Sequence, residues 1–183
     1  MSDEAKAQEL ISIFVCSKDI DIENFIKQKA IMFEKLGKSR TFLVFDEDAD
    51  KFNILGYYTI AIQVLKIPSE YSNRRILKLD GLSAKRNGEI ITELPAILIG
   101  QIGKNELYKD NVTGHKIMEF CLNTIFDGQA LLGGRLIILE CKKIPYLYEF
   151  YEQFGFNKLE KEYQDDEFVQ FFRIFEKNEL VEK

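Results

Sequence analysis

Histidine, cysteine and proline are scarce in this chain of 183 residues, which has one histidine, three cysteines and three prolines. Cys16, Cys121 and Cys141 lie far apart without the spacing of metal ligands, and His115 is the only histidine. A zinc site or a cysteine–histidine nucleophile pair is therefore not expected, because such sites need several of these side chains in a defined pattern. With few prolines, regular helices and strands should dominate.

Long apolar runs and excess positive charge are also missing. No stretch approaches the roughly 18 consecutive apolar residues that span a membrane, and residues 1–10 lack the basic start and apolar run of a secretory signal. A net charge of −5 excludes a surface that attracts phosphate backbones everywhere, but it leaves room for a local basic groove. We expect a cytoplasmic protein with no membrane partner, and one domain over residues 1–183.

Two acidic runs read as turns between strands. The run DEDAD at residues 46–50 lacks the glycine and the distal glutamate of a calcium loop, so it predicts a polar hairpin turn. The run DDE at residues 165–167 predicts a second polar turn.

The spacing of apolar residues predicts the order of helices and strands. Residues 17–38 have the three- and four-residue spacing of an amphipathic helix that ends at Gly37. The period then changes to two, which predicts strands at residues 41–46 and 52–65 as an antiparallel hairpin. A short strand is expected at residues 76–82, whereas residues 84–89 carry no readable pattern.

The second half of the sequence predicts a strand, a helix and another strand. Residues 96–103 and 135–140 are apolar enough for strands buried on both faces. The polar loop and helix between them, up to Phe126, have the length of a crossover between parallel strands. A tyrosine-rich helix should follow and end at Gly155, before a strand pair at residues 156–160 and 168–175. The predicted fold class is therefore α/β with a mixed sheet.

The start of the crossover helix is a candidate phosphate site. The run KDNVTGHK, from Lys109 to Lys116, brings a helix N-terminus out of a loop that follows a buried strand. Main-chain N–H groups and the helix dipole bind phosphate at such an end. Gly114 has no Cβ to block a diphosphate, and Lys109, His115 and Lys116 add positive charge. Neither GxxxxGK[ST] nor GxGxxG is present.

Residues 94–160 resemble the GNAT family of acetyl-CoA-dependent N-acetyltransferases, through AILIGQIGKN, TGHKIM, RLIILE and FYEQFGF in that order. The most specific element is FYxxxGF, from Phe150 to Phe156. The family's phosphate-loop pattern, Q/R-x-x-G-x-G/A, corresponds to residues 109–114. There Gly114 matches, Lys109 replaces the usual glutamine or arginine, and Val112 replaces the first glycine.

The resemblance implies the GNAT fold, with N-terminal antiparallel strands, a central parallel pair and a C-terminal strand pair. It implies acetyl-CoA as co-substrate, with Tyr151 donating a proton to the departing thiolate. Glu140 and Glu93 are the candidate bases. Close approach of the pantetheine arm would also explain the glycines at positions 100 and 103. The implied acetyl-CoA-binding residues are Ile102, Gly103, Lys104, Lys109, Asp110, Asn111, Val112, Thr113, Gly114, His115 and Lys116.

The acceptor implied by the resemblance is an amine. GYYTIAIQVLKIPSE and PAILIGQIGKN are similar to segments of the acetyltransferase toxins of toxin–antitoxin pairs, which modify aminoacyl-tRNA, although Gln101 stands in the place of an arginine. A small molecule, a peptide or aminoacyl-tRNA stays open as acceptor, as do a homodimer and an antitoxin as partners. A local basic patch could form from Arg74, Arg75, Lys85, Arg86, Lys142 and Lys143, although exposed charges of this kind more often serve solubility.

Three interpretations remain at this point. The first is an active N-acetyltransferase, and the second is a catalytically silent GNAT-like acyl-CoA-binding or regulatory module. The third is an interaction protein without an acyl-CoA site.

Overall fold

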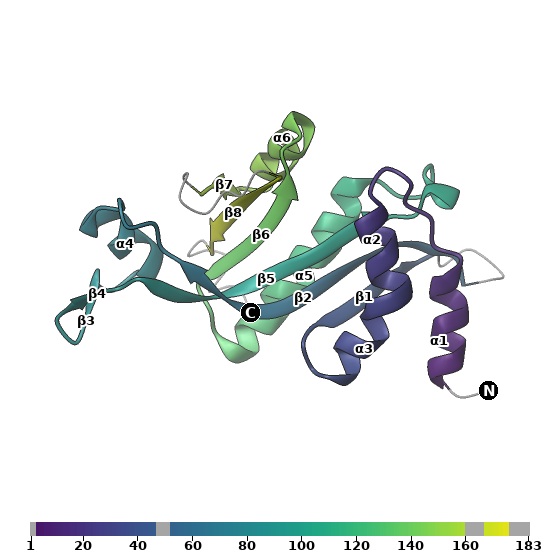
Figure 1. The fold of residues 1–183 in the computed structure, drawn as a ribbon, viewed down its shortest axis with the longest axis horizontal. Coiled ribbons are helices and arrows are strands. Elements are labelled where there is room, and N and C mark those ends of the chain that lie inside the picture. The colour runs from purple at the N-terminus through teal and green to yellow at the C-terminus, as the bar shows by residue number, and fades with distance from the viewer. Residues whose placement is uncertain (1–2, 47–51, 160–166, 176–183) are drawn as a thin grey trace. The chain divides into compact units, whose positions relative to one another are not determined.

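A computed structural model of the chain describes residues 3–46, 52–159 and 167–175 (Figure 1). Six strands form a mixed sheet in the order β1-β2-β5-β6-β8-β7, and β3 and β4 form a separate hairpin. The strands are β1 Arg40–Phe45, β2 Ile54–Lys66, β3 Lys85–Arg86, β4 Glu89–Ile90, β5 Glu93–Lys104, β6 Leu136–Lys142, β7 Asn157–Lys158 and β8 Phe168–Ile174.

The pairing of the strands confirms the predicted fold class. β1 is antiparallel to β2, and β8 is antiparallel to both β6 and β7. β5 and β6 are parallel, with Ile97 opposite Ile137 and Ile99 opposite Leu139. The mixed sheet therefore has the predicted antiparallel, parallel and antiparallel parts. Of the two predicted acidic turns, residues 47–50 and 165–166 lie outside the described residues.

The predicted helices are present, and one more lies at the N-terminus. The helical region expected at residues 17–38 begins after Asp19, whose carboxylate accepts a hydrogen bond from the Asp21 N–H group, and Gly37 follows its end with a φ of 65°. Its middle is a π-helical turn, η1, which an analysis of spacing does not foresee. The helices are α1 Asp3–Ser12, α2 Ile20–Asn24, η1 Phe25–Lys29, α3 Ala30–Lys35, α4 Asn73–Asp80, η2 Glu106–Tyr108, α5 Gly114–Leu132 and α6 Pro145–Gln153.

The chain divides into two compact units. The first comprises Met1–Ala61 and Gly100–Asp127, and the second comprises Ile62–Ile99 and Gly128–Lys183. β2, β5 and α5 contribute residues to both units. The single domain expected from the length of the chain stays a prediction.

In the first unit, helices cover both faces of the strands (Figure 1). Phe14, Ile26 and Tyr57 are completely buried in a core shared by α1, η1 and β2. β2 also lies close to α5, since a Cβ atom added at Gly56 would lie 2.4 Å from Ile117 Cδ1 on α5. Gly56 therefore allows β2 and α5 to pack tightly.

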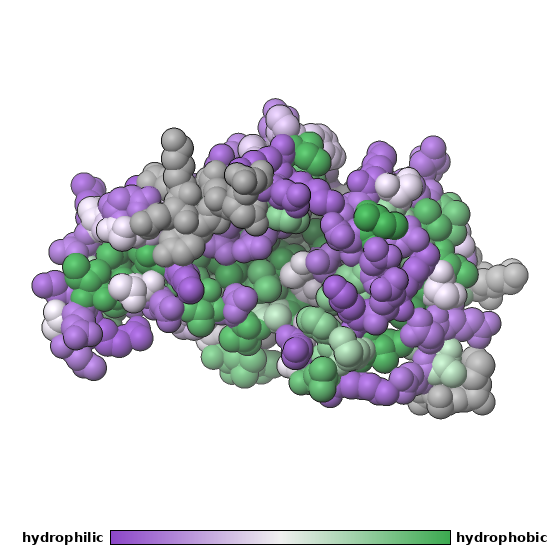
Figure 2. Space-filling model, viewed as in Figure 1, coloured by the Kyte–Doolittle hydropathy of each residue, from purple (hydrophilic) through white to green (hydrophobic). Residues whose placement is uncertain are grey.

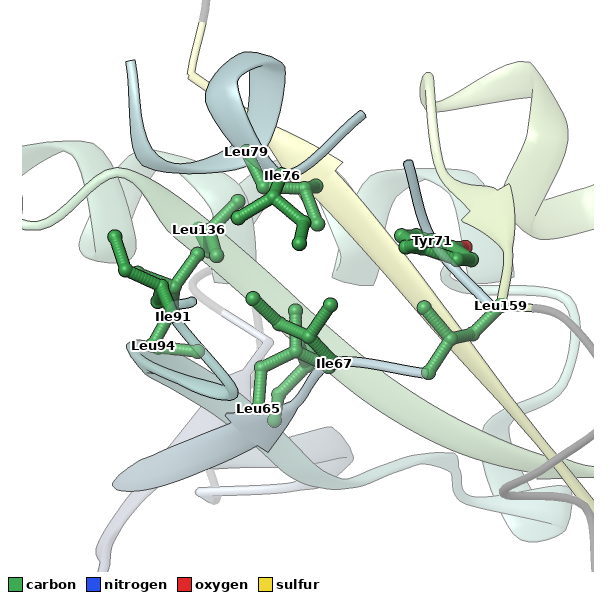
Figure 3. Close-up of a cluster of buried hydrophobic side chains, with 11 residues drawn as sticks. Leu65, Ile67, Tyr71, Ile76, Leu79, Ile91, Leu94, Leu136 and Leu159 are labelled. Carbon is green, nitrogen blue, oxygen red and sulfur yellow. The ribbon is translucent and has the colours of Figure 1, made fainter. Parts of the chain in front are cut away.

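The second unit has its own core, in which α4 and the segment before β5 pack against strands (Figure 3). β6 is buried on both faces, because Leu136, Ile137, Ile138 and Leu139 are each at most 1% exposed. The prediction of a doubly buried strand is thus confirmed there. Leu65, Ile76 and Leu159 join the same core from β2, α4 and the residue after β7.

Residues 76–82 are not the predicted strand, because α4 occupies most of this segment. The Ser72 hydroxyl accepts a hydrogen bond from the Arg75 N–H group, and Gly81 ends the helix in the left-handed conformation with a φ of 86°. Ile76 and Leu79 are buried three residues apart on one helix face. Capping and helical spacing together override the local density of apolar residues.

The polar segment at residues 84–89 contains the β3–β4 hairpin. Lys85 pairs with Ile90 and Arg86 with Glu89. Asn87 and Gly88 between them have φ values of 54° and 88°. Both central residues of this two-residue connection therefore lie in the left-handed region, which Asn-Gly favours in tight hairpins.

Candidate functional site

The candidate phosphate loop follows β5 and η2, and a buried asparagine holds the end of β5 in place. Asn105 is completely buried, and its Nδ2 atom donates to the Ile54 carbonyl at 2.8 Å. Its Oδ1 atom accepts from the N–H groups of Val15 at 3.2 Å and Leu107 at 3.1 Å. One side chain therefore joins the end of β5 to β2, to the segment after α1 and to η2.

A carboxylate next to Asn105 ties the same region to the segment before α2. Glu106 accepts hydrogen bonds from the Ser17 hydroxyl at 2.7 Å and from the Lys18 N–H group at 3.1 Å. These donors stabilise the charged form, so the Ser17 hydroxyl bond first and the Lys18 amide second lower the pKa of Glu106. Asn105 and Glu106 thus fix the chain between the end of β5 and the loop.

Thr113 begins the crossover helix. Its hydroxyl accepts a hydrogen bond from the Lys116 N–H group at 3.1 Å, and its carbonyl accepts from the Ile117 N–H group at 3.2 Å. Thr113 is therefore an N-cap, and α5 starts at Gly114, within the run at residues 109–116 where the sequence predicts a helix start. At 19 residues, α5 is long enough for its dipole to concentrate positive potential at this end.

The loop that precedes α5 lies at the surface while one side chain anchors it. Lys109, Asp110 and Asn111 are exposed, whereas Val112 is 8% exposed. The valine in the place of the family's glycine therefore turns its side chain into the protein. Asn111 Nδ2 donates to an Asp46 carboxylate oxygen at 3.3 Å.

Positive side chains lie beside this loop. The Lys104 ammonium group donates to the Lys109 carbonyl at 3.0 Å, which places its charge at the start of the loop. The Lys116 ammonium group lies 3.1 Å from Glu119 and 5.1 Å from the centre of the Phe120 ring. His115 is exposed at the first turn of α5. The first unit thus contains all eleven predicted acetyl-CoA-binding residues, with a cation at the loop and a capped helix end.

Ile102 and Gly103 lie in the last part of β5, in the same unit as the loop. Ile102 is half-buried. A Cβ atom at Gly103 would lie 2.4 Å from Ile22 Cγ2 and 3.4 Å from the Tyr57 ring. Packing of the segment around Ile22 therefore explains the glycine at position 103 without a ligand.

Tyr151 belongs to the second unit and lies among aromatic rings. It is 6% exposed on α6, and its ring centre lies 5.2 Å from that of Phe150, 6.2 Å from Phe156 and 6.1 Å from Phe171. The Phe156 N–H group donates to the Tyr151 carbonyl at 3.2 Å. The residues of the FYxxxGF motif therefore pack around this tyrosine, and Gly155, with a φ of 77°, allows the chain to turn after α6.

The other tyrosines of α6 have surface or packing roles. Tyr146 is 68% exposed, and the Tyr148 ring packs 5.6 Å from Phe171 with the Lys158 ammonium group 5.0 Å from its centre. Of the two candidate bases, Glu140 accepts a hydrogen bond from Gln170 at 3.1 Å, and Glu93 is exposed.

Sequence reasoning missed Asn105, Glu106 and Tyr57, which fix the end of β5, the segment between α1 and α2, and α2. The Tyr57 hydroxyl donates to the Ile22 carbonyl at 2.6 Å, and burial raises its pKa above the ordinary range. The only sequence signal was the pair Asn105-Glu106 directly after a buried strand, since polar residues at that position often cap a turn.

No three metal-binding side chains group together anywhere in residues 3–46, 52–159 and 167–175. Over the same ranges, no helix has the length and apolar character needed to cross a membrane.

No family model matches the sequence, and no curated protein matches it. Solved structures do match, and among them are acetyltransferase toxins with the GNAT fold, so this chain has that fold. One is AtaT complexed with acetyl-methionyl-tRNAfMet, at 14% identity and a TM-score of 0.66 over 90% of this chain and 86% of that chain. A tyrosine-to-phenylalanine variant of KacT matches at 16% identity and a TM-score of 0.67, over 90% and 86%.

A third structure is a tyrosine-to-phenylalanine variant of AtaT, bound to the C-terminus of the antitoxin AtaR and to acetyl-CoA. It matches at 13% identity and a TM-score of 0.63, over 90% of this chain and 84% of that chain. The GNAT fold predicted from four short motifs is thus confirmed over most of the chain.

Proposed function

We propose that this protein transfers an acetyl group from acetyl-CoA to an amine, and that the amine is the α-amino group of an aminoacyl-tRNA. The observation that carries the proposal is the capped start of α5. It combines an exposed loop, the dipole of a 19-residue helix and the Lys104 ammonium group at the loop. This is an environment in which a diphosphate is stabilised.

The residues present fit the diphosphate of acetyl-CoA. The main-chain N–H groups around Thr113 and Gly114 would hold it, because Val112 is buried and leaves the loop's exposed side to the ligand. Bound acetyl-CoA supplies the acetyl group as an activated thioester. The two solved AtaT complexes, with acetyl-CoA and with acetyl-methionyl-tRNAfMet, support this choice of donor and acceptor.

Tyr151 is proposed as the proton donor to the thiolate that leaves. A tyrosine phenol can give its proton to a thiolate as negative charge develops there. Three aromatic rings restrict the orientation of its ring. Two of the similar solved structures, of AtaT and KacT, carry a tyrosine-to-phenylalanine substitution, which supports a test of a tyrosine in this chain.

The experiment that tests this proposal compares Tyr151→Phe with Tyr148→Phe. Both variants keep the ring and lose one hydroxyl, so stability changes little. Release of CoA in the presence of methionyl-tRNA is measured under saturating conditions. We expect Tyr151→Phe to lower kcat by about 10²-fold or more, whereas Tyr148→Phe retains activity.

Two results would contradict the proposal. Equal kcat values for both variants would remove Tyr151 from the reaction. Saturable binding of acetyl-CoA without turnover on methionyl-tRNA, on peptides or on small amines would instead indicate a silent acyl-CoA-binding module.

A further inference from the structure

α4 and the β3–β4 hairpin carry a cluster of positive side chains, which we name the basic surface. It consists of Arg74, Arg75, Lys78, Lys85 and Arg86, and all five are exposed. Residues 72–91 contain these five basic and only two acidic side chains, although the chain as a whole has a net charge of −5. Figure 2 shows hydrophilic side chains gathered over the hairpin. The positive charge of the protein is thus locally concentrated in the second unit.

The basic surface is held in shape by contacts with its own unit. The Arg75 guanidinium group lies 4.4 Å above the Tyr71 ring, and Arg86 lies 3.6 Å from the Asp80 carboxylate. The same carboxylate accepts hydrogen bonds from the N–H groups of Leu82 at 3.1 Å and Ser83 at 2.9 Å. Asp80 therefore joins the end of α4 to the start of the hairpin, and Arg86 and two main-chain N–H groups interact with its negative charge.

The helix dipole does not favour the two arginines at the start of α4. Arg74 and Arg75 lie in the first turn of the helix, where the dipole disfavours positive charge. Side chains that oppose a local stability rule are expected where they serve binding. A cation cluster of this kind fits a partner with regularly spaced negative charges, and a phosphate backbone provides them.

The basic surface and Tyr151 belong to one compact unit. Tyr71, under Arg75, lies in the same buried cluster as Leu159 (Figure 3). Leu159 follows Phe156 by three residues, and Phe156 packs against Tyr151. The basic surface and the proposed proton donor therefore lie in the same unit.

We propose that the basic surface binds the phosphate backbone of the RNA whose aminoacyl end is acetylated. This inference rests on the proposed function and adds the part of the chain that contacts the acceptor's backbone. The cations of α4 and of the hairpin neutralise separate phosphates, and the affinity then depends on the salt concentration. The alternative partner is an acidic protein segment, since Leu77, Leu82 and Ile90 are also exposed here.

The test uses the double variant Arg74→Gln with Lys85→Gln. A matched control is Lys6→Gln with Lys29→Gln, which removes two exposed lysines from the first unit. For each protein, KM and kcat with methionyl-tRNA are measured over a range of salt concentrations, and binding of uncharged tRNA is measured by fluorescence anisotropy.

We expect the double variant to raise KM for methionyl-tRNA roughly fivefold or more at low salt, with kcat much less affected. The slope of log affinity against log salt should fall by about two, one for each phosphate contact. The control should match the parent protein in both respects.

The inference is wrong if the double variant and the control have the same tRNA affinity and the same salt slope. It is also wrong if the double variant loses binding to an acidic polyglutamate peptide but keeps its affinity for tRNA. Acetyl-CoA calorimetry on the same samples separates the two proposals. Normal acetyl-CoA binding with unchanged tRNA affinity would overturn only the basic surface, whereas salt-sensitive tRNA binding without acetyl-CoA binding would overturn only the proposed function.

Discussion

Replacement of Asn105 by alanine should destabilise the protein more than any exposed asparagine can. The substitution removes three hydrogen bonds, one to the Ile54 carbonyl and one each from the Val15 and Leu107 N–H groups. The Ile54 carbonyl is left without this donor in a buried environment, at a cost of about 1–3 kcal/mol, and the two part-buried amides lose about 0.5–1.5 kcal/mol each. We therefore expect a loss of about 3 kcal/mol in the free energy of unfolding.

That loss is a large fraction of the roughly 5–15 kcal/mol that stabilises a typical domain. Urea denaturation followed by circular dichroism measures it, with the slope of free energy against urea expected to stay constant. Asn111→Ala is the matched control, because Asn111 is exposed and its side chain donates to Asp46 at 3.3 Å. It should cost about 0.5 kcal/mol or less. If both variants lose the same small amount, Asn105 does not organise the end of β5.

Three further predictions follow from individual contacts. Gly103→Ala should lower the free energy of unfolding by about 1–3 kcal/mol, because its Cβ would lie 2.4 Å from Ile22 Cγ2. In urea titrations, the double variant Gly103→Ala with Ile22→Ala should lose less stability than the sum of the two single variants. The lowered pKa of Glu106 contributes stability at pH values above the ordinary glutamate value of about 4.3, and this contribution is lost as the pH falls through the lowered pKa. Melting curves from pH 7 to acid should show a weaker decline for Glu106→Gln, and an equal decline would contradict the assignment. Burial raises the pKa of the Cys121 thiol to about 12 and that of Cys141 to about 11, so an aromatic disulfide reagent at pH 8 should react with the native thiols roughly 100-fold or more slowly than with those of the unfolded chain.

The strands and helices that sequence reasoning predicted well are those with a strong and continuous pattern. β6 has apolar side chains on both faces, so its run of aliphatic residues has one simple explanation, a central strand. The capped start of α5 was readable from Thr113 and Gly114, and the turn after α6 from Gly155. These signals are local, because a few consecutive residues determine them.

The misread segment shows how local density misleads. Apolar residues are frequent at residues 76–82, and that favoured a strand. The helix is determined instead by Ser72 at its start and Gly81 at its end. Ser72 lies outside the predicted strand, and Gly81 lies within it as a turn signal. The Asn87-Gly88 hairpin signal was present too, but flanking polar strands gave no apolar alternation to accompany it.

The contacts that shape the candidate site could not be read from the sequence, because they join distant residues. The chain separation between Val15 and Asn105 is 90 residues, yet their main-chain and side-chain atoms lie 3.2 Å apart. The packing of Ile22 against Gly103 is equally remote in sequence. A glycine in a strand predicts a close approach, but only the fold identifies the neighbour, which here is a side chain of the same unit.

The most direct test of the account is calorimetric titration of the folded protein with acetyl-CoA, alongside Gly114→Pro and Gly114→Ala. Proline at the first position of a helix preserves the helix but removes one main-chain N–H group, whereas alanine keeps that group. We expect saturable binding to the parent protein, binding weakened about tenfold or more by Gly114→Pro, and a smaller change for Gly114→Ala. Absence of saturable heat with the parent protein, or equal affinities for the proline and alanine variants, would contradict the claim that the start of α5 holds the diphosphate.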